Sequence, residues 1–376
     1  MPSPRVLIVG AGCTGAFLSR ALRRHAPATV IVVWDAAELP GGRMRTEYAQ
    51  LGALLGKADS GAQYITQDER AAAEHAELYA SLRAAGLLLP FSGAIVGSRA
   101  ADGGGQNFIC PDGMGALVQR TFDEAAVTLT CPRKAVRVSR RTGGGGVGWD
   151  VTSDDGAIEG FDAVVLTAPV PEQLLLLESS GLDGWIDGEL RRRLAALQYS
   201  SRYAISLFFP PEVRSLFDAN LQWTAKYVPK EEDDALVYIC YDSAKRAQHD
   251  GVVSLMAHTS VPYGLHHLGA QTADDKVADD LLERLRRLLP WMPSPAQTSL
   301  HAWRLSQVRY PLELPSGQAC LPLLPPQPGV ESAPLVMAGD SFSPLGSRMD
   351  GCIQSGEAAA AALNDALYGR VASGGE

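Results

Sequence analysis

The sequence has no excess of positive charge and no long apolar run. Its 376 residues include 33 Lys and Arg against 42 Asp and Glu, which gives a formal net charge of −9. Such a chain offers no basic field for nucleic acid or anionic lipid. No run of 18 apolar residues occurs, and the first strand is expected to begin at about residue 5. We therefore expect no membrane span, no cleavable leader and, by default, a cytoplasmic location.

Cysteine motifs are also lacking. The six cysteines are scattered, with no C-x-x-C pair and no spacing typical of metal ligands. Cys13 lies inside a glycine-rich turn, where a disulfide is not expected. This usage favours a reducing compartment over a disulfide framework. His266 and His267 are interpreted as surface residues because adjacent side chains diverge and no further ligands accompany them, so no metal site is predicted.

The N-terminal segment "RVLIVGAGCTGAFLSRALRR" carries the first positive signal. Residues 6–9 are an apolar, β-branched run typical of a buried strand, and a G-x-G-x-x-G turn follows at Gly10, Gly12 and Gly15. Apolar residues then recur at helical spacing. Gly10 permits the tight turn, Gly12 lets backbone N–H groups approach a pyrophosphate, and Gly15 lets the helix pack on the strand. This order predicts a dinucleotide-binding βα unit.

An acidic residue at the expected distance strengthens this prediction. A second strand over 30–34 ends in Asp35, which lies twenty residues after Gly15. A carboxylate there would accept hydrogen bonds from ribose hydroxyls and would repel a 2′-phosphate, which argues against NADP at this site.

Segments further along the chain favour FAD over NAD. "AELPGGRMRT" contains Gly41-Gly42-Arg43, and it resembles the G-G-R motif of the amine-oxidase-like FAD flavoproteins. "ADSGAQYIT", residues 58–66, resembles the segment of those proteins that runs along the isoalloxazine. Residues 335–342, "LVMAGDSF", resemble their last cofactor-binding strand, whose Asp340 would bind the ribityl or pyrophosphate region.

The C-terminal helix is expected to complete the cofactor site. Asp350 is interpreted as its N-cap, and Gly351-Cys352-Ile353 as its beginning. The positive end of that helix would stabilise negative charge at the flavin N1–C2=O locus. Val136 matches the place where such flavoproteins contact adenine. The predicted cofactor residues are Gly10, Ala11, Gly12, Thr14, Gly15, Asp35, Gly42, Arg43, Gln63, Tyr64, Val136, Asp340, Asp350, Gly351, Cys352 and Ile353.

The predicted fold class is α/β, as a two-domain FAD flavoprotein. A Rossmann-like domain is expected over 1–68, 104–172 and 297–376, because the cofactor motifs fall at both ends of the chain. An α+β substrate domain, with a mixed sheet and helices, is expected over 69–103 and 173–296. Residues 69–86 are predicted to be one helix, and the strands of 127–153 to form a small antiparallel set.

Several longer stretches resemble the renalase family across nearly the whole chain. They include "YSSRYAISLFF", "HTSVPYG", "WRLSQV" and "DGCIQSG", in matching order. The resemblance implies non-covalent FAD. It also implies oxidation of the 2- and 6-dihydro isomers of NAD(P)H to β-NAD(P)⁺, with O₂ reoxidising the flavin to give H₂O₂. The implied partners are thus a dihydronicotinamide dinucleotide and O₂.

Tyr64, His258 and Trp303 are the predicted catalytic residues, carried over from the matching motifs as a wall against the flavin face. Each could instead have a structural role, as core aromatics or a strand-end histidine. Arg304 and Gln307 could contact substrate phosphate or cofactor, or could tie strands together. No acid–base constellation is evident, and a dihydronicotinamide, already an activated hydride donor, needs none.

The sequence departs from the family pattern in two places, and two other functions remain open. Cys320 lies in a proline-rich region without the context of a covalent flavin attachment, and the segment 311–334 is richer in proline than the family leads us to expect. The alternatives are an amine oxidase acting on a small amine, with an aromatic cage facing the flavin, and a non-catalytic FAD-binding signalling protein.

Overall fold

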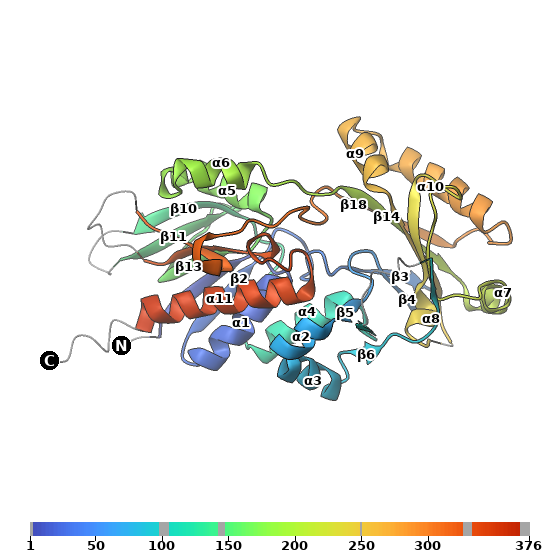
Figure 1. The fold of residues 1–376 in the computed structure, drawn as a ribbon, viewed down its shortest axis with the longest axis horizontal. Coiled ribbons are helices and arrows are strands. Elements are labelled where there is room, and N and C mark those ends of the chain that lie inside the picture. The colour runs from blue at the N-terminus through green and yellow to red at the C-terminus, as the bar shows by residue number, and fades with distance from the viewer. Residues whose placement is uncertain (1–2, 98–104, 142–146, 249, 326–332, 369–376) are drawn as a thin grey trace. The chain divides into compact units, whose positions relative to one another are not determined.

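The structure is a computed structural model that describes residues 3–97, 105–141, 147–248, 250–325 and 333–368. The chain divides into two compact units. The first unit comprises residues 1–42, 118–198 and 307–376, and the second comprises 43–117 and 199–306. Each unit is therefore built from segments distant in the sequence, as the colours of Figure 1 show.

The first unit contains a six-stranded sheet that is parallel except at one edge. Its strands, in spatial order, are β19 (Cys320–Leu323), β20 (Leu335–Ala338), β13 (Ala163–Leu166), β1 (Arg5–Val9), β2 (Val30–Trp34) and β9 (Thr128–Thr130). Only β19 runs antiparallel, against β20. The central strands are buried on both faces and so are almost wholly apolar. This sheet confirms the Rossmann-like prediction.

Helices and a second sheet cover the two faces of that sheet. In Figure 1, α1 (Cys13–His25) and α11 (Met349–Tyr368) lie together on one side. On the other side lies the antiparallel sheet of β10 (Ala135–Arg141), β11 (Gly148–Ser153) and β12 (Ile158–Phe161), with α5 (Val170–Ser179) and α6 (Gly188–Ala195) beyond it. Three short helices also belong to this unit: η1 (Asp183–Trp185), η3 (Pro315–Gly317) and η4 (Asp340–Phe342). A shared apolar core joins the layers through Trp34, Trp149 and Phe161.

The second unit is built on a six-stranded sheet. Its strands, in spatial order, are β18 (Gln297–Trp303), β14 (Arg202–Phe209), β17 (Val253–Thr259), β16 (Leu236–Tyr241), β15 (Ala225–Tyr227) and β7 (Ile95–Val96). One face packs on helices, notably α10 (Asp274–Leu288), through Val277, Leu281 and Leu285. The remaining helices of this side are α7 (Arg214–Asn220) and α9 (Val261–Gly269), with η2 (Pro211–Val213).

A β-hairpin covers part of the opposite face. It consists of β3 (Thr46–Leu51) and β4 (Leu54–Asp59), and a Cβ on Gly56 would come within 2.6 Å of Val252 and 2.8 Å of Phe208. This close approach requires glycine at position 56. The remaining elements are the small sheet of β5 (Ile65–Gln67), β8 (Gln106–Ile109) and β6 (Leu89–Pro90), and the helices α2 (Glu69–Glu74), α3 (Ala76–Ala84) and α8 (Asp242–Lys245). Helix α4 (Met114–Glu124) runs from the second unit into the first.

The compact units differ from the predicted division in several segments. Residues 43–68, 104–117 and 297–306 cluster with the second unit, and 173–198 with the first. The hairpin at 46–59 belongs to the second unit because it packs on that unit's sheet. Two local predictions were wrong. The expected helix over 69–86 is interrupted at His75, and Thr128–Thr130 joins the parallel sheet beside β2 instead of the antiparallel set.

Part of the proline-rich segment also has a defined path. Cys320–Leu323 forms β19, which extends the parallel sheet at its edge, while 326–332 lie outside the described residues. Over the described ranges, no helix combines the length and apolar character needed to cross a bilayer.

Candidate functional site

The glycine turn of the first unit has the close contacts that dinucleotide binding requires. A Cβ on Gly10 would lie 2.5 Å from the Thr167 hydroxyl, and one on Gly15 would lie 2.3 Å from the Gly10 carbonyl oxygen. At Gly12, by contrast, the nearest atom to an added Cβ is the Gly42 Cα, at an ordinary contact distance of 3.9 Å. Helix α1 begins here with no capping side chain and no acidic residue in its first turn. Its N-terminus therefore suits a bound phosphate.

Asp35 lies at the end of β2, as predicted, and faces this turn. One of its carboxylate oxygens accepts a hydrogen bond from the Ala11 N–H at 2.6 Å, and the other accepts one from the Ala37 N–H at 2.8 Å. Each carboxylate oxygen has further acceptor capacity for a ribose hydroxyl. Asp35 therefore both shapes the turn and remains able to bind ribose.

The second glycine pair lies against the first. Gly41 donates its N–H to the Ala11 carbonyl at 2.9 Å, and a Cβ on Gly42 would come within 3.2 Å of the Gly12 Cα. Gly42 has a φ of +53°, which favours glycine. Arg43 follows in the second unit and donates to the Ser306 carbonyl at 3.3 Å.

The C-terminal motif surrounds the start of α11. Asp340 is buried in η4, where it accepts a hydrogen bond from Ser347, and Asp350 is also buried. Helix α11 begins at Met349, so Asp350 lies in its first turn and is not the N-cap that the sequence predicted. A Cβ on Gly351 would come within 2.2 Å of the Gly346 carbonyl oxygen, so glycine is needed there. Cys352 is partly buried and Ile353 is fully buried.

The other predicted cofactor residues of the first unit differ in their exposure to solvent. Val136 is 36% exposed on β10, and its carbonyl accepts the Ser179 hydroxyl. Ala11 is buried in the turn, and Thr14 is buried in α1. The Cys320 thiol is buried in β19, where desolvation raises its pKa to about 11. A thiol with this pKa is almost wholly protonated at neutral pH and is therefore a poor nucleophile.

In the second unit, one main-chain oxygen joins two predicted catalytic residues. The Ser60 carbonyl accepts hydrogen bonds from His258 Nε2 at 2.8 Å and from Trp303 Nε1 at 2.9 Å. Because a carbonyl can only accept, the proton of the imidazole lies on Nε2 and Nδ1 is the unprotonated nitrogen. Desolvation by burial lowers the pKa of His258 to about 4, so the ring is neutral at pH 7.

Tyr64, the third predicted catalytic residue, lies four residues further along the same segment. Its hydroxyl is 2.5 Å from that of Tyr227, and its ring packs edge-on against Phe91. Tyr227 in turn contacts Tyr238, whose ring centroid is 6.1 Å from that of His258. Strand register places His258 opposite Tyr238, and Tyr238 opposite Tyr227, on the same face of the sheet. The structure thus gathers all three residues on one aromatic face.

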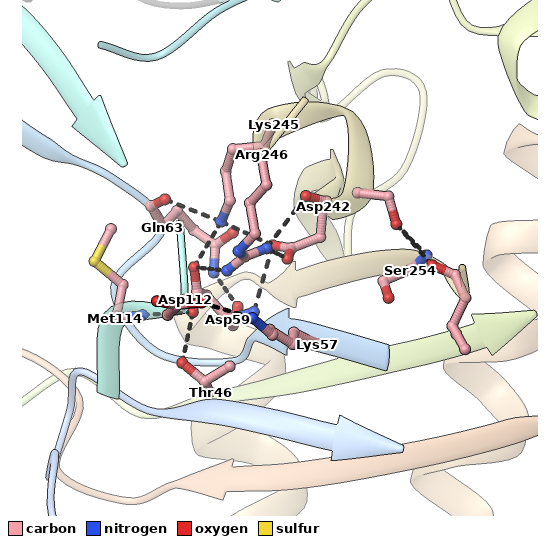
Figure 2. A network of polar contacts seen from close by, with 12 residues as sticks. Thr46, Lys57, Asp59, Gln63, Asp112, Met114, Asp242, Lys245, Arg246 and Ser254 are labelled. Carbon is pink, nitrogen blue, oxygen red and sulfur yellow. Dashed lines mark hydrogen bonds and ion pairs between the residues drawn. The ribbon is translucent and has the colours of Figure 1, made fainter. Parts of the chain in front are cut away.

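A buried cluster of four charges holds the beginning of this segment. Lys245 Nζ lies 2.9 Å from an Asp59 carboxylate oxygen and 2.7 Å from one of Asp242, and Arg246 pairs with both aspartates. All four side chains are at most 3% exposed. Figure 2 shows them pointing toward one another. Isolated charges cannot be buried at this depth, so the four stabilise one another.

The cluster also fixes the backbone between Asp59 and Gln63. Asp59 accepts the Met114 N–H at 2.9 Å and the Thr46 hydroxyl at 2.8 Å, and Lys245 donates to the Gln63 carbonyl at 3.1 Å. Burial alone would raise the pKa of Asp59, but Arg246 and Lys245 outweigh burial and hold that pKa below its usual range. Asp59 is therefore ionised at neutral pH, and its bonds to the segment persist.

Gln63 offers a test of the predicted cofactor contact. Its Nε2 donates to the carbonyls of Asp59 and Gly61, while its buried Oε1 has no donor within the described part of the chain. A buried acceptor without a donor fits a bound ligand that brings an N–H or O–H group. Arg304 and Gln307, the two weaker candidates, are exposed.

Sequence reasoning missed the charge cluster. Asp242, Lys245 and Arg246 lie in "YDSAKR", where the spacing of three and four residues is that of helical ion pairs. That spacing was the available signal. It does not reveal Asp59, which lies 186 residues before Lys245.

Comparisons with known proteins agree with this geometry. The family model for flavin-containing amine oxidoreductases matches residues 86–364, and that for NAD(P)-binding Rossmann-like domains matches residues 8–81. Mouse renalase is 31% identical over 355 residues, which span 93% of this chain and 96% of the mouse protein.

Solved structures show the same fold at low sequence identity. A putative protoporphyrinogen oxidase from an Exiguobacterium species is 14% identical, with a TM-score of 0.66 over 96% of this chain and 99% of its own. Cyclohexylamine oxidase from Brevibacterium oxydans is 14% identical, with a TM-score of 0.64 over 97% and 100% of the two chains. The chain therefore belongs to the flavin-containing amine oxidoreductases, and within that family it is a renalase-like flavoprotein oxidoreductase.

Proposed function

We propose that this protein is a FAD-dependent oxidase that converts the 2- and 6-dihydro isomers of NAD(P)H to β-NAD(P)⁺, with O₂ as the electron acceptor and H₂O₂ as the second product. The observation that carries the proposal is the Ser60 carbonyl, which holds His258 and Trp303 on one aromatic face together with Tyr64. This face suits a flat, uncharged ring.

The protonation state of His258 supports a substrate that brings its own reactive hydride. A neutral imidazole whose Nε2–H is already bound to a carbonyl can orient a ring or accept a hydrogen bond at Nδ1, but it is not a strong general base. When bound, FAD supplies a hydride acceptor at N5 and reacts with O₂. The residues of this chain then have to bind the nicotinamide, orient it and exclude water.

The first unit is the proposed FAD-binding domain. Its glycine turn with Asp35 would hold the pyrophosphate and ribose, Asp340 would bind the ribityl or pyrophosphate region, and the start of α11 at Gly351 would face the flavin N1–C2=O locus. The second unit is the proposed substrate domain, and it also carries the predicted cofactor residues Arg43, Gln63 and Tyr64. The buried Cys320 thiol, whose pKa is raised by desolvation, supports non-covalent attachment of the flavin.

The experiment is anaerobic mixing of the FAD-loaded protein with 2- and 6-dihydroNAD(P), β-NADH and a panel of amines while the flavin absorbance is recorded. Bleaching by the dihydro isomers alone, with β-NAD(P)⁺ as product, is the expected result. Release of H₂O₂ on admitting air should follow. Bleaching by amines with inert isomers would contradict the proposal, and a flavin that no donor reduces would indicate a binding protein.

A small amine is the second candidate substrate. It is favoured by the fold shared with cyclohexylamine oxidase and by the three phenol rings of Tyr64, Tyr227 and Tyr238, which could face an amine beside the flavin. The panel of amines in the same experiment separates the two candidates directly.

A further inference from the structure

Arg202 is a partly buried cation on the face of the sheet that carries His258 and Trp303, and no carboxylate of the described residues pairs with it. It is the first residue of β14, and its Nη1 donates to the Thr259 carbonyl at 2.8 Å. Within the described ranges this carbonyl is its one hydrogen-bond acceptor, and no salt bridge reaches it. Burial lowers the pKa of its guanidinium, and no acidic residue offsets that effect. At least three of its five N–H donors thus have no protein partner.

Several other enclosed cations of this chain are neutralised by carboxylates, and two arginines without a carboxylate, Arg23 and Arg214, each donate to at least three main-chain carbonyls. Lys245 and Arg246 share Asp59 and Asp242, and Arg284 contacts three aspartates. Arg133 pairs with Glu159 at 2.5 Å. Because an enclosed charge is costly unless an opposite charge is supplied, Arg202 differs in a way that indicates a missing anion.

The strand register places Arg202 on the face that carries the predicted catalytic residues. It lies directly opposite Trp303 of β18, and two residues before Ala204, which is opposite His258. Residues opposite one another and residues two apart share one face of a sheet, and neighbouring strands are about 5 Å apart. The electrostatic influence of Arg202 on His258 agrees with this closeness.

We propose that Arg202 is an anion subsite that binds a phosphate of the dinucleotide substrate while the nicotinamide ring lies at His258 and Trp303. A guanidinium matches phosphate oxygens with two parallel N–H donors, which a lysine cannot do. The subsite deepens the proposed function and rests on it for the identity of the ligand. It makes the diphosphate, and not the ring alone, a determinant of specificity.

The test measures binding of products and their fragments to the oxidised holoenzyme, with no turnover involved. The probes are NAD⁺, nicotinamide mononucleotide and nicotinamide riboside, which carry two, one and no phosphate groups. Arg202→Gln should weaken NAD⁺ and the mononucleotide about tenfold or more and leave the riboside within about twofold. Arg202→Lys should recover part of the loss, since it restores charge without the planar fork.

Arg287→Gln is the control, because Arg287 is exposed on α10, where it pairs with the exposed Glu283 at 3.0 Å. It should change no binding constant. Equal weakening of all three probes by Arg202→Gln would assign Arg202 a structural role and overturn the proposal, as would no weakening at all. If Arg202→Gln fails to fold, Arg202→Lys takes its place. A ratio of mononucleotide to riboside affinity below that of the unsubstituted enzyme would support the proposal, and an unchanged ratio would overturn it.

The outcomes also separate the subsite from the proposed reaction. Phosphate-dependent binding that needs Arg202, in an enzyme whose flavin the dihydro isomers do not reduce, would retain the subsite and reject the reaction. Reduction of the flavin by the isomers, with binding indifferent to Arg202, would do the reverse.

Discussion

At the residue scale, the second unit shows how a few polar atoms organise an aromatic surface. Ser60 supplies a carbonyl, His258 and Trp303 supply N–H donors, and the charge cluster holds the adjoining Asp59. The hydrogen-bond donors to Ser60 come from two different strands, β17 and β18.

The titration of His258 should make the protein less stable in mild acid. Its folded pKa of about 4 lies below the ordinary value of 6.5, so between these values the unfolded chain binds a proton that the folded chain does not. The free energy of unfolding should then fall as pH drops from 7 to 5, by on the order of 1 kcal/mol from this group. Urea titrations at both pH values should show a smaller fall in His258→Gln. An equal fall in both proteins would show that His258 titrates normally.

Removal of one charge from the buried cluster should be strongly destabilising. Lys245→Met leaves Asp59 and Asp242 with Arg246 alone, and breaking such a buried pair costs about 3–5 kcal/mol. Denaturant unfolding measures this cost. The matched control is Lys57→Met in the neighbouring hairpin. Its partner Asp112 is 76% exposed, so the loss should be about 1 kcal/mol or less. Similar losses in the two variants would contradict the interpretation of the cluster.

At the scale of elements, helix α11 is fitted closely to α1. A Cβ on Gly356 would come within 2.8 Å of the Leu18 nitrogen and 3.1 Å of the Thr14 carbonyl oxygen. Both helices begin at predicted cofactor motifs, so their spacing bears on the glycine turn as well as on stability.

Gly356→Ala should accordingly separate these helices. We expect a loss of about 1–3 kcal/mol in the free energy of unfolding and a lower flavin content after purification. Gly188→Ala is the control, because Gly188 is in α6 of the same unit and an added Cβ there meets no atom within 4 Å. That variant should be neutral or slightly stabilised. Full flavin content and unchanged stability in Gly356→Ala would show that the contact relaxes freely.

Elements with a strong local signature could be predicted from the sequence. The glycine turn, the strand that ends in Asp35 and the strand that ends in Gly339-Asp340 all appear where expected. Thr128–Thr130 was misassigned because a strand of three residues says nothing of its partner. The cluster of Asp59 with Lys245 could not be predicted either, since only the folded chain brings the two together.

At the scale of the whole molecule, the chain crosses between two units several times. Both termini belong to the first unit, whose sheet joins β1 and β20 from opposite ends of the chain. The positions of the cofactor motifs predicted this discontinuity. The boundaries were less predictable, because the hairpin at 46–59 follows the cofactor motifs in sequence but packs with the second unit.

Four of the six cysteines should be unreactive in the folded protein. All six are free, and burial raises the pKa of Cys131 and Cys320 to about 11, raises that of Cys110 further, and also raises that of Cys240. Iodoacetamide at pH 7.5 should modify these four thiols slowly in the native protein and all six positions in the urea-unfolded chain, as peptide mass mapping would show. A reducing agent should leave the unfolding temperature unchanged. Rapid modification of these four thiols in the native protein would contradict this expectation.

The acceptor for His258 and Trp303 is a main-chain oxygen, and this has a consequence for how the protein can diverge. Every amino acid at position 60 provides the same carbonyl, so a substitution there leaves the acceptor in place. The two donors are side-chain groups, so substitution of His258 or Trp303 can remove them. The acceptor role itself therefore places no demand on the side chain at position 60. The demand on that side chain comes from its burial and from its hydroxyl, which donates to Glu47 at 3.0 Å.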